Sequence, residues 1–400
     1  MSPINEASVA SVVLGLDRWF DAMRVTWPTP GYGGPVVHWW NHSLVYRGAG
    51  LDWRYEGIVD GYLVLWRRTG DRRWLVKATR AGDDLVEGQL ANGCFRNSMF
   101  ELNPGDGGTP HEAAADVALL LLAQATRTDN DTGSDCFLAA ALHNLKSFFM
   151  ERLWHKESGM LWDSPSVESF VPNKAATFIE AVLHLAAQLP DPDLVARYAL
   201  PTGQHILTMQ VRRPGDILDG AIAQNRFGKR VVESYFPLYV ARCVPALLGL
   251  WEWTGEERFR DGAVAAARFV ARVRDADGGL PQVLYARGRW NRHPRWIAGS
   301  GDVVRALTLA SRHAEELDPA STVGWIVNGA RPDGRVAAAS GFGRVLPWGS
   351  RRDRVADEIG VVGWCDKAFR ALAPIADPRL LDADVAVEPP AAIGVAGVLR

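Results

Sequence analysis

Carboxylate side chains recur where the apolar helical segments of this sequence begin. The acids placed in this way are Asp60, Glu112, Glu233, Asp302 and Glu358. An acid at a helix start can simply cap the helix and complement the positive end of its dipole. Several acids gathered in one place can instead supply one protonated and one ionised carboxyl, the pair that cleaves glycosidic bonds. The first candidates for such a pair are Glu112 and Glu233, followed by Asp302 and Glu358.

Two further acids, Asp116 and Glu180, stand deeper inside apolar helical segments. A carboxylate buried in an apolar helix needs a partner. These two acids are therefore either structural links or members of a site.

Histidine, tyrosine, lysine and arginine residues near the same positions support a different chemistry. A His, Tyr or Lys base can remove the proton next to a sugar carboxylate while arginine neutralises the negative charge. The candidates are His111, Lys174, Tyr235, Arg289, Arg292, His293 and Arg295. Segment 287–296 is the most basic and aromatic stretch of the chain. It either binds an anionic substrate or forms a solvated loop.

The chain contains 16 tryptophans, and many of them stand outside the helical segments. A flat aromatic ring offers a large apolar face on which a sugar ring can stack. We therefore expect Trp39, Trp40, Trp290 and Trp296 to line a cleft. The other expected substrate-binding residues are His42, His111, Lys174, Tyr235, Arg292 and Trp364.

Several classes of partner are disfavoured. A formal net charge of -2 argues against a nucleic-acid partner, which binds to a basic face. No His-Glu-x-x-His pattern occurs, and the glycine-rich segments at 31–35 and 340–343 lack the context of phosphate or dinucleotide loops, so no metal or cofactor is expected. The absence of Gly-x-Ser-x-Gly leaves an esterase triad unsupported.

The compartment is expected to be the cytoplasm. Residues 1–10 lack the basic stretch and apolar core of a secretory signal. No apolar segment approaches the roughly 20 residues that cross a bilayer. The four cysteines are scattered without paired spacing, which fits free thiols.

The positioning elements are indicated by a motif that occurs twice, at 62–74 and 250–259. Each copy has an apolar run, then Thr-Gly, an acid, Arg and an aromatic residue. Glycine ends a helix because it takes the left-handed conformation at low cost, and the acid then starts the next helix. Each copy is therefore a helical hairpin, and its recurrence suggests a repeat architecture.

The periodicity predicts about twelve helices. They cover approximately 7–23, 56–68, 72–90, 112–124, 135–153, 173–188, 194–209, 234–253, 256–274, 301–313, 320–328 and 356–372. The more apolar helices, which start near 56, 112, 173, 234, 301 and 356, alternate with amphipathic ones. Hardly any stretch alternates like a strand.

This order favours a closed double ring. If the apolar helices form an inner ring, every long loop lies on one rim, over the amino ends of those helices. We expect a single domain over residues 1–400, with a core of about 7–373 and an extended tail at 374–400.

On these features the chain resembles the six-hairpin (α/α)6-barrel superfamily, whose members include glycoside hydrolases, polysaccharide lyases and some sugar epimerases. The resemblance rests on the two Thr-Gly-acid hairpins, on Gly-Thr-Pro-His-Glu-Ala-Ala-Ala at 108–115, and on the number and order of the helices. It covers about 7–373 and implies an all-α (α/α)6 barrel. It transfers no catalytic residue, because its motifs belong to the fold.

We expect a glycoside hydrolase that acts on an oligosaccharide or a glycosylated metabolite through paired carboxylates in a Trp-lined cleft. The alternatives are a lyase or epimerase acting on an anionic sugar, an isoprenoid cyclase, and a binding module without catalysis. Aromatic faces can stabilise the carbocations of a cyclase. The absence of an Asp-x-Asp-Asp run counts against the usual protonating cyclase.

Overall fold

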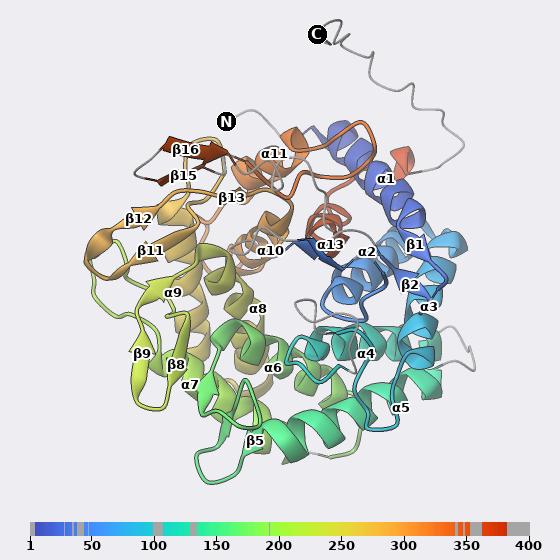
Figure 1. The fold of residues 1–400 in the computed structure, drawn as a ribbon, viewed down its shortest axis with the longest axis horizontal. Helices are drawn as coiled ribbons and strands as arrows, with labels where there is room; N and C mark the ends of the chain where they lie inside the picture. The colour runs from blue at the N-terminus through green and yellow to red at the C-terminus, as the bar shows by residue number, and fades with distance from the viewer. Residues whose placement is uncertain are drawn as a thin grey trace, which may run out of the picture.

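Two concentric rings of helices make up the body of the protein (Figure 1). The computed structural model describes residues 5–27, 29–33, 36–37, 44–46, 48–98, 107–128, 134–191, 193–340, 343–346, 349–352 and 362–381. The inner ring consists of α2 (Arg54–Thr69), α4 (Glu112–Thr128), α6 (Pro172–Ala186), α8 (Pro237–Thr254), α10 (Gly301–Ala310) and α13 (Val362–Leu372). The outer ring consists of α1 (Glu6–Ala22), α3 (Arg72–Glu87), α5 (Ser134–Asn144) continued by η1 (Leu145–Leu153), η2 (Val195–Ala199) continued by α7 (Leu200–Thr208), α9 (Glu257–Val273) and α11 (Ala320–Asn328).

The inner ring is closed. Each inner helix packs against the next one along the chain, and α13 packs against α2. Each of the first five inner helices also packs against the outer helix that follows it, while α1 packs against α13. Because every outer helix returns the chain to the same end, all six inner helices begin at that end. The predicted all-α (α/α)6 barrel of about twelve helices is confirmed.

The repeated Thr-Gly motif forms the tight turns between α2 and α3 and between α8 and α9. Gly70 and Gly255 end the first helix of each pair with φ of 73° and 71°. In both turns the threonine hydroxyl, from Thr69 or Thr254, accepts a hydrogen bond of 3.2 Å from the backbone N–H of the acid after the glycine. The threonine thus satisfies an amide that the helix leaves unpaired.

Helix α13 packs very closely against both of its inner neighbours. A Cβ atom added to Gly57 of α2 would lie 2.5 Å from the backbone oxygen of Asp366. One added to Gly301 of α10 would lie 2.0 Å from the backbone oxygen of Lys367. Glycine at these two positions lets the backbones approach and the ring close.

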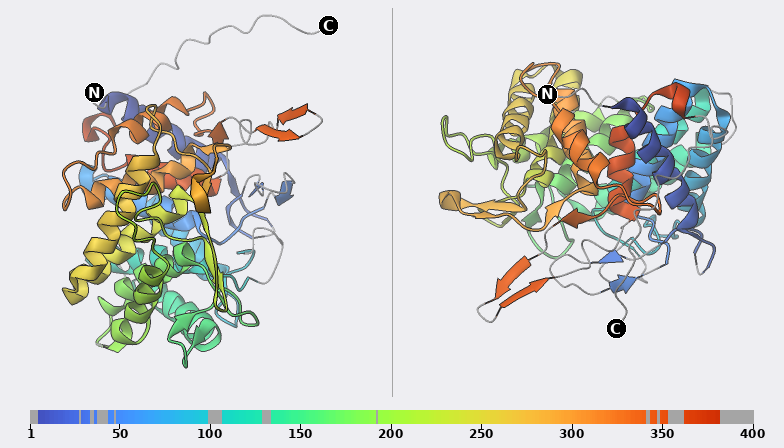
Figure 2. Two further views of the ribbon diagram at one scale, coloured as in Figure 1. Left: turned by 90° about the vertical axis from the view of Figure 1, so that its left-hand side faces the viewer. Right: turned by 90° about the horizontal axis from the view of Figure 1, so that it is seen from above.

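The long loops before the inner helices carry short antiparallel strands, which gather on one side of the helices (Figure 2). The strands are β1 (Arg24–Val25), β2 (Gly31–Tyr32), β3 (Val36–Val37), β4 (Leu44–Tyr46), β5 (Trp154–His155), β6 (Met160–Leu161), β7 (Ser169–Phe170), β8 (Asn225–Phe227), β9 (Arg230–Val232), β10 (Ser234–Tyr235), β11 (Val283–Tyr285), β12 (Trp290–Asn291), β13 (Arg295–Trp296), β14 (Ala339–Ser340), β15 (Gly343–Leu346) and β16 (Gly349–Arg352). β7–β8–β9 and β10–β11–β12 form three-stranded sheets. The sequence did not predict these strands, because two to four residues are too few to show an alternating pattern.

Beyond α13, the 3-10 turn η5 (Pro378–Leu380) ends the described residues of the expected tail, and residues 382–400 lie outside them. Among the described residues, no helix has the length and apolar character that a membrane span requires.

Candidate active site

Half-buried aromatic side chains stand at the end of the inner ring where its helices begin, which we call the rim. Trp53 directly precedes α2, and its ring meets the ring of His111, just before α4, with centroids 5.0 Å apart. Trp296 precedes α10 and stacks on Trp364 of α13 with centroids 4.5 Å apart and an interplanar angle of 28°. Aromatic rings therefore flank the starts of four inner helices.

The imidazole of His111 is held neutral at this rim. Burial lowers the pKa of His111 well below its ordinary value of 6.5, and the nearby ammonium groups of Lys174 and Lys367 lower it further. Lys174 pairs with Asp163 at 2.9 Å, and Lys367 pairs with Asp302 at 3.0 Å. The rim thus combines a neutral imidazole, which can accept a proton, with two cations that can stabilise negative charge.

A chain of buried ion pairs crosses the interior of the inner ring. Arg242 of α8 donates to both carboxylate oxygens of Glu56 of α2, at 2.7 and 2.8 Å. Arg370 of α13 donates to Glu56 and to Asp302 of α10, each at 2.5 Å. Arg242 also pairs with Glu180 of α6 at 3.6 Å, and Arg305 of α10 donates to Glu180 at 2.6 Å. We call these six residues the central ion network.

Neighbouring cations keep Glu56 and Asp302 ionised. Burial alone would raise the pKa of Glu56, but Arg242 and Arg370 outweigh burial and lower this pKa to about 2. In the same way, Lys367 and Arg370 outweigh burial and hold the pKa of Asp302 below its ordinary value. The predicted catalytic acid Asp302 is therefore a buried, ion-paired carboxylate, and its role in catalysis stays a prediction.

Glu112, at the start of α4, is also completely buried. It accepts hydrogen bonds of 2.6 Å from the Ser98 hydroxyl, the Gly108 backbone N–H and the Asn144 amide. Burial raises its pKa. These contacts tie the start of α4 to α5 and to the preceding loop, so they fit a structural link, and a catalytic role for Glu112 stays a prediction.

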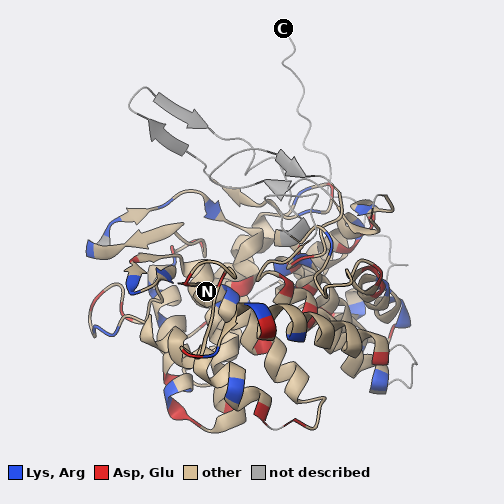
Figure 3. Ribbon diagram, turned by 60° about the horizontal axis from the view of Figure 1, so that its bottom comes forward, with Lys and Arg blue, Asp and Glu red and all other residues tan. Residues whose placement is uncertain are grey.

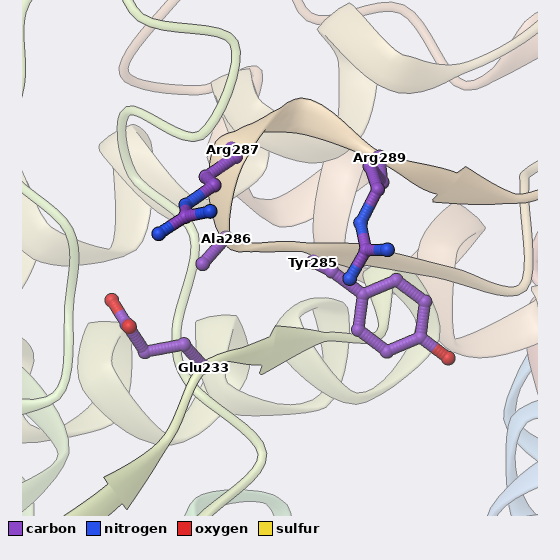
Figure 4. A pocket seen from close by; sticks show the side chains of 5 residues that line it. All are labelled: Glu233, Tyr285, Ala286, Arg287 and Arg289. Atoms are coloured by element: carbon purple, nitrogen blue, oxygen red, sulfur yellow. The ribbon is translucent and has the colours of Figure 1, made fainter.

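Glu233 is exposed and lies between β9 and β10. It lines a cavity of about 420 Å³ together with Tyr285, Ala286, Arg287 and Arg289 (Figure 4). No contact among the described residues brings Glu233 to Glu112. The two acids first proposed as a pair thus stand in separate environments, one buried and one in an open cavity.

The other predicted site residues are distributed as follows. Asp60 is half-buried on α2, one turn after Glu56, and no described hydrogen bond or ion pair engages its carboxylate. Tyr235, on β10, is buried, and burial raises its pKa. Arg292 lies over the ring of Trp290 at 5.3 Å and pairs with Asp275 at 3.0 Å. The remaining four predictions, Trp39, Trp40, His42 and Glu358, lie outside the described residues.

The sequence interpretation did not include Trp53, Lys367 or the arginines of the central ion network in the site. Trp53 could have been predicted as a site residue, because it directly precedes a predicted apolar helix. Lys367 follows Trp364 by three residues, which places both on one face of α13. Arg242 and Arg370 stand in apolar helices, where an arginine is almost never fully buried unless it is paired.

Asp366 of α13 gives a testable pH dependence. Both of its carboxyl oxygens are buried without a hydrogen-bond partner, and burial raises its pKa well above 3.8. The folded chain therefore keeps a proton that the unfolded chain releases, so the cost to folding grows as the pH rises above 3.8.

We expect the free energy of unfolding of Asp366→Asn, relative to that of the wild type, to be higher at pH 8 than at pH 4. The expected increase is more than about 1.4 kcal/mol, the value of one pKa unit. Denaturant unfolding at the two pH values measures this gain. An equal effect of the substitution at both pH values would contradict a neutral Asp366.

The fold matches solved structures over almost its entire length. The cellobiose 2-epimerase from Bacillus thermoamylovorans B4167 aligns with a TM-score of 0.67 and 13% identity, covering 92% of this chain and 98% of that chain. This chain is an (α/α)6 barrel. A D-mannose isomerase aligns with a TM-score of 0.65 and 11% identity, covering 92% of this chain and 99% of that chain. An unsaturated glucuronyl hydrolase specific for heparin aligns with a TM-score of 0.64 and 14% identity, covering 92% of this chain and 96% of that chain. No family model and no curated protein matches the sequence, so the similarity concerns the barrel alone.

Proposed function

We propose that this barrel is a carbohydrate-active enzyme whose reaction takes place at the rim. The observation that carries the proposal is the set of half-buried aromatic rings beside His111 at the starts of the inner helices. Such rings offer flat apolar faces to a sugar while nearby polar groups reach its hydroxyls. The names of the three similar structures, a hydrolase, an epimerase and an isomerase, support sugar chemistry on this fold.

The first reaction that we propose is hydrolysis of a glycosidic bond in an oligosaccharide or a glycosylated metabolite. It requires two carboxyls on opposite sides of the bond, one protonated and one ionised. Asp302 is the second residue of α10, and Glu358 stands four residues before α13 in the sequence. Because α10 packs against α13, we propose these two acids as the pair to test first.

The second reaction is epimerisation of an anionic sugar, or elimination from it, and a specific observation favours it. His111 is neutral, and two ammonium groups lie close enough to lower its pKa. A neutral imidazole can remove a proton next to a carbonyl or carboxylate, while Lys174 and Lys367 stabilise the negative charge that develops.

Product analysis separates these reactions. Purified protein is incubated with neutral and acidic oligosaccharides. Hydrolysis releases reducing sugar without a new double bond, elimination forms an unsaturated product that absorbs ultraviolet light, and epimerisation conserves mass. Cyclisation of a polyprenyl substrate, or saccharide binding without any turnover, would overturn the proposal.

A further inference from the structure

The turn of the β11–β12 hairpin forms a wall of the open cavity that Glu233 also lines. The Tyr285 N–H donates to the Arg289 carbonyl at 2.8 Å and closes the turn. The Ala286 N–H donates to the Glu233 carbonyl at 3.2 Å and ties the turn to the segment before β10. The walls of this cavity of about 420 Å³ are thus fixed by backbone hydrogen bonds.

Two arginines of this cavity are unpaired, unlike their neighbours in the chain. Arg292 and Arg295 both pair with Asp275, at 3.0 and 3.2 Å. Among the described residues, neither Arg287 nor Arg289 forms an ion pair or a side-chain hydrogen bond. The tip of the hairpin is consequently basic (Figure 3).

The side chains are arranged around the cavity in a way that suits a polar ligand. Figure 4 shows the guanidinium of Arg287 facing the carboxylate of Glu233, with Arg289 beside the ring of Tyr285. Tyr285 is 38% exposed, so part of its ring is available for contact. Two cations, an acceptor and an aromatic face therefore surround one space.

The backbone at Arg287 is unusual. Its φ of 70° and ψ of 20° lie in the left-handed region, although Gly288 follows directly and would adopt this conformation at no cost. Only one other non-glycine among the described residues, Asn97, has a positive φ. Strained residues of this kind cluster at ligand-binding sites, and this one places a guanidinium beside the cavity.

We propose that this cavity binds an acidic sugar unit of the saccharide that reacts at the rim. Arg287 and Arg289 hold the oxyanion, a carboxylate or a sulfate ester, because guanidinium groups match its geometry. Glu233 accepts hydrogen bonds from the sugar hydroxyls, and the sugar ring lies against Tyr285. This inference rests on the proposed function and assigns its substrate class as acidic oligosaccharides.

The cavity lies within reach of a saccharide at the rim. Pro237, the first residue of α8, follows Glu233 by four positions in the chain. At about 3.3 Å per extended residue, this segment spans at most about 13 Å. A saccharide of a few units can therefore extend from the cavity over the start of α8, which belongs to the rim.

The experiment measures saccharide binding by calorimetry, independently of turnover. The probes are a uronic-acid disaccharide with its neutral methyl ester, and a sulfated disaccharide with its desulfated form. The test variant combines Arg287→Gly, which keeps the left-handed turn, with Arg289→Gln. The control is Arg230→Gln, which removes one exposed arginine from neighbouring β9.

We expect the wild type and the control to bind an acidic probe at least 10-fold more tightly than its neutral form, and the double variant to lose this preference. The probe pair that shows this preference tells whether the cavity binds a carboxylate or a sulfate ester. Equal affinity for acidic and neutral probes in the wild type, or a preference retained by the double variant, would overturn the proposal. If the double variant loses binding while no saccharide is turned over, the cavity assignment stands and the proposed enzymatic function fails.

Discussion

Replacing Arg370 by Met should lower the free energy of unfolding by about 3–5 kcal/mol, the cost of breaking a buried ion pair. Arg370 joins α13 to α2 through Glu56 and to α10 through Asp302, and all three side chains are at most 5% exposed. Methionine fills a similar volume but leaves two buried carboxylates short of a cation. Denaturant unfolding at neutral pH measures the loss.

The matched control is Arg379→Met. Arg379 pairs with Asp377 at 2.7 Å, but its side chain is 87% exposed. Surface pairs of this kind contribute about 0–1 kcal/mol. If both variants lose the same stability, the central ion network does not hold the ring together in the way that we infer.

Replacing His111 by Asn should lower kcat by about 10²- to 10⁴-fold, the usual contribution of a positioned acid or base. The neutral imidazole stands at the rim beside Trp53, and the loss is expected because His111 removes the sugar proton in the epimerisation or elimination that we propose. Steady-state kinetics on the saccharide that is turned over, together with a thermal melt of the variant, measure the effect.

His205→Asn is the control for this variant. His205 lies on α7 of the outer ring, is bonded to the Ser158 backbone oxygen at 3.1 Å, and has its pKa lowered by burial, as His111 does. It should leave kcat unchanged. Normal turnover in a folded His111→Asn variant would show that His111 is not the group that transfers the proton.

The arrangement of helices could be predicted from the sequence because local signals specify it. Gly70 and Gly255 mark the turns, and the alternation of apolar and amphipathic helices separates the inner ring from the outer ring. Helix boundaries agree with the structure to within a few residues, except that α13 is described only from Val362.

The candidate site could be predicted only in part, because a helix start does not reveal where its side chain ends up. Glu112 and Asp302 stand at helix starts as expected, but partners from distant segments bury them, Asn144 for the first and Arg370 for the second. Periodicity says nothing of such contacts. His111 and Trp364, which the sequence grouped with the substrate-binding residues, do lie at the rim.

The most direct test of the central claim is a crystal structure with a bound saccharide. We expect a sugar ring to stack on Trp53, Trp296 or Trp364 at the starts of the inner helices, with a hydroxyl or the glycosidic oxygen within hydrogen-bond distance of His111 or of an acid at that rim. A saccharide bound only at the opposite end of the inner ring, where its helices end, would contradict the claim that the rim is the active site.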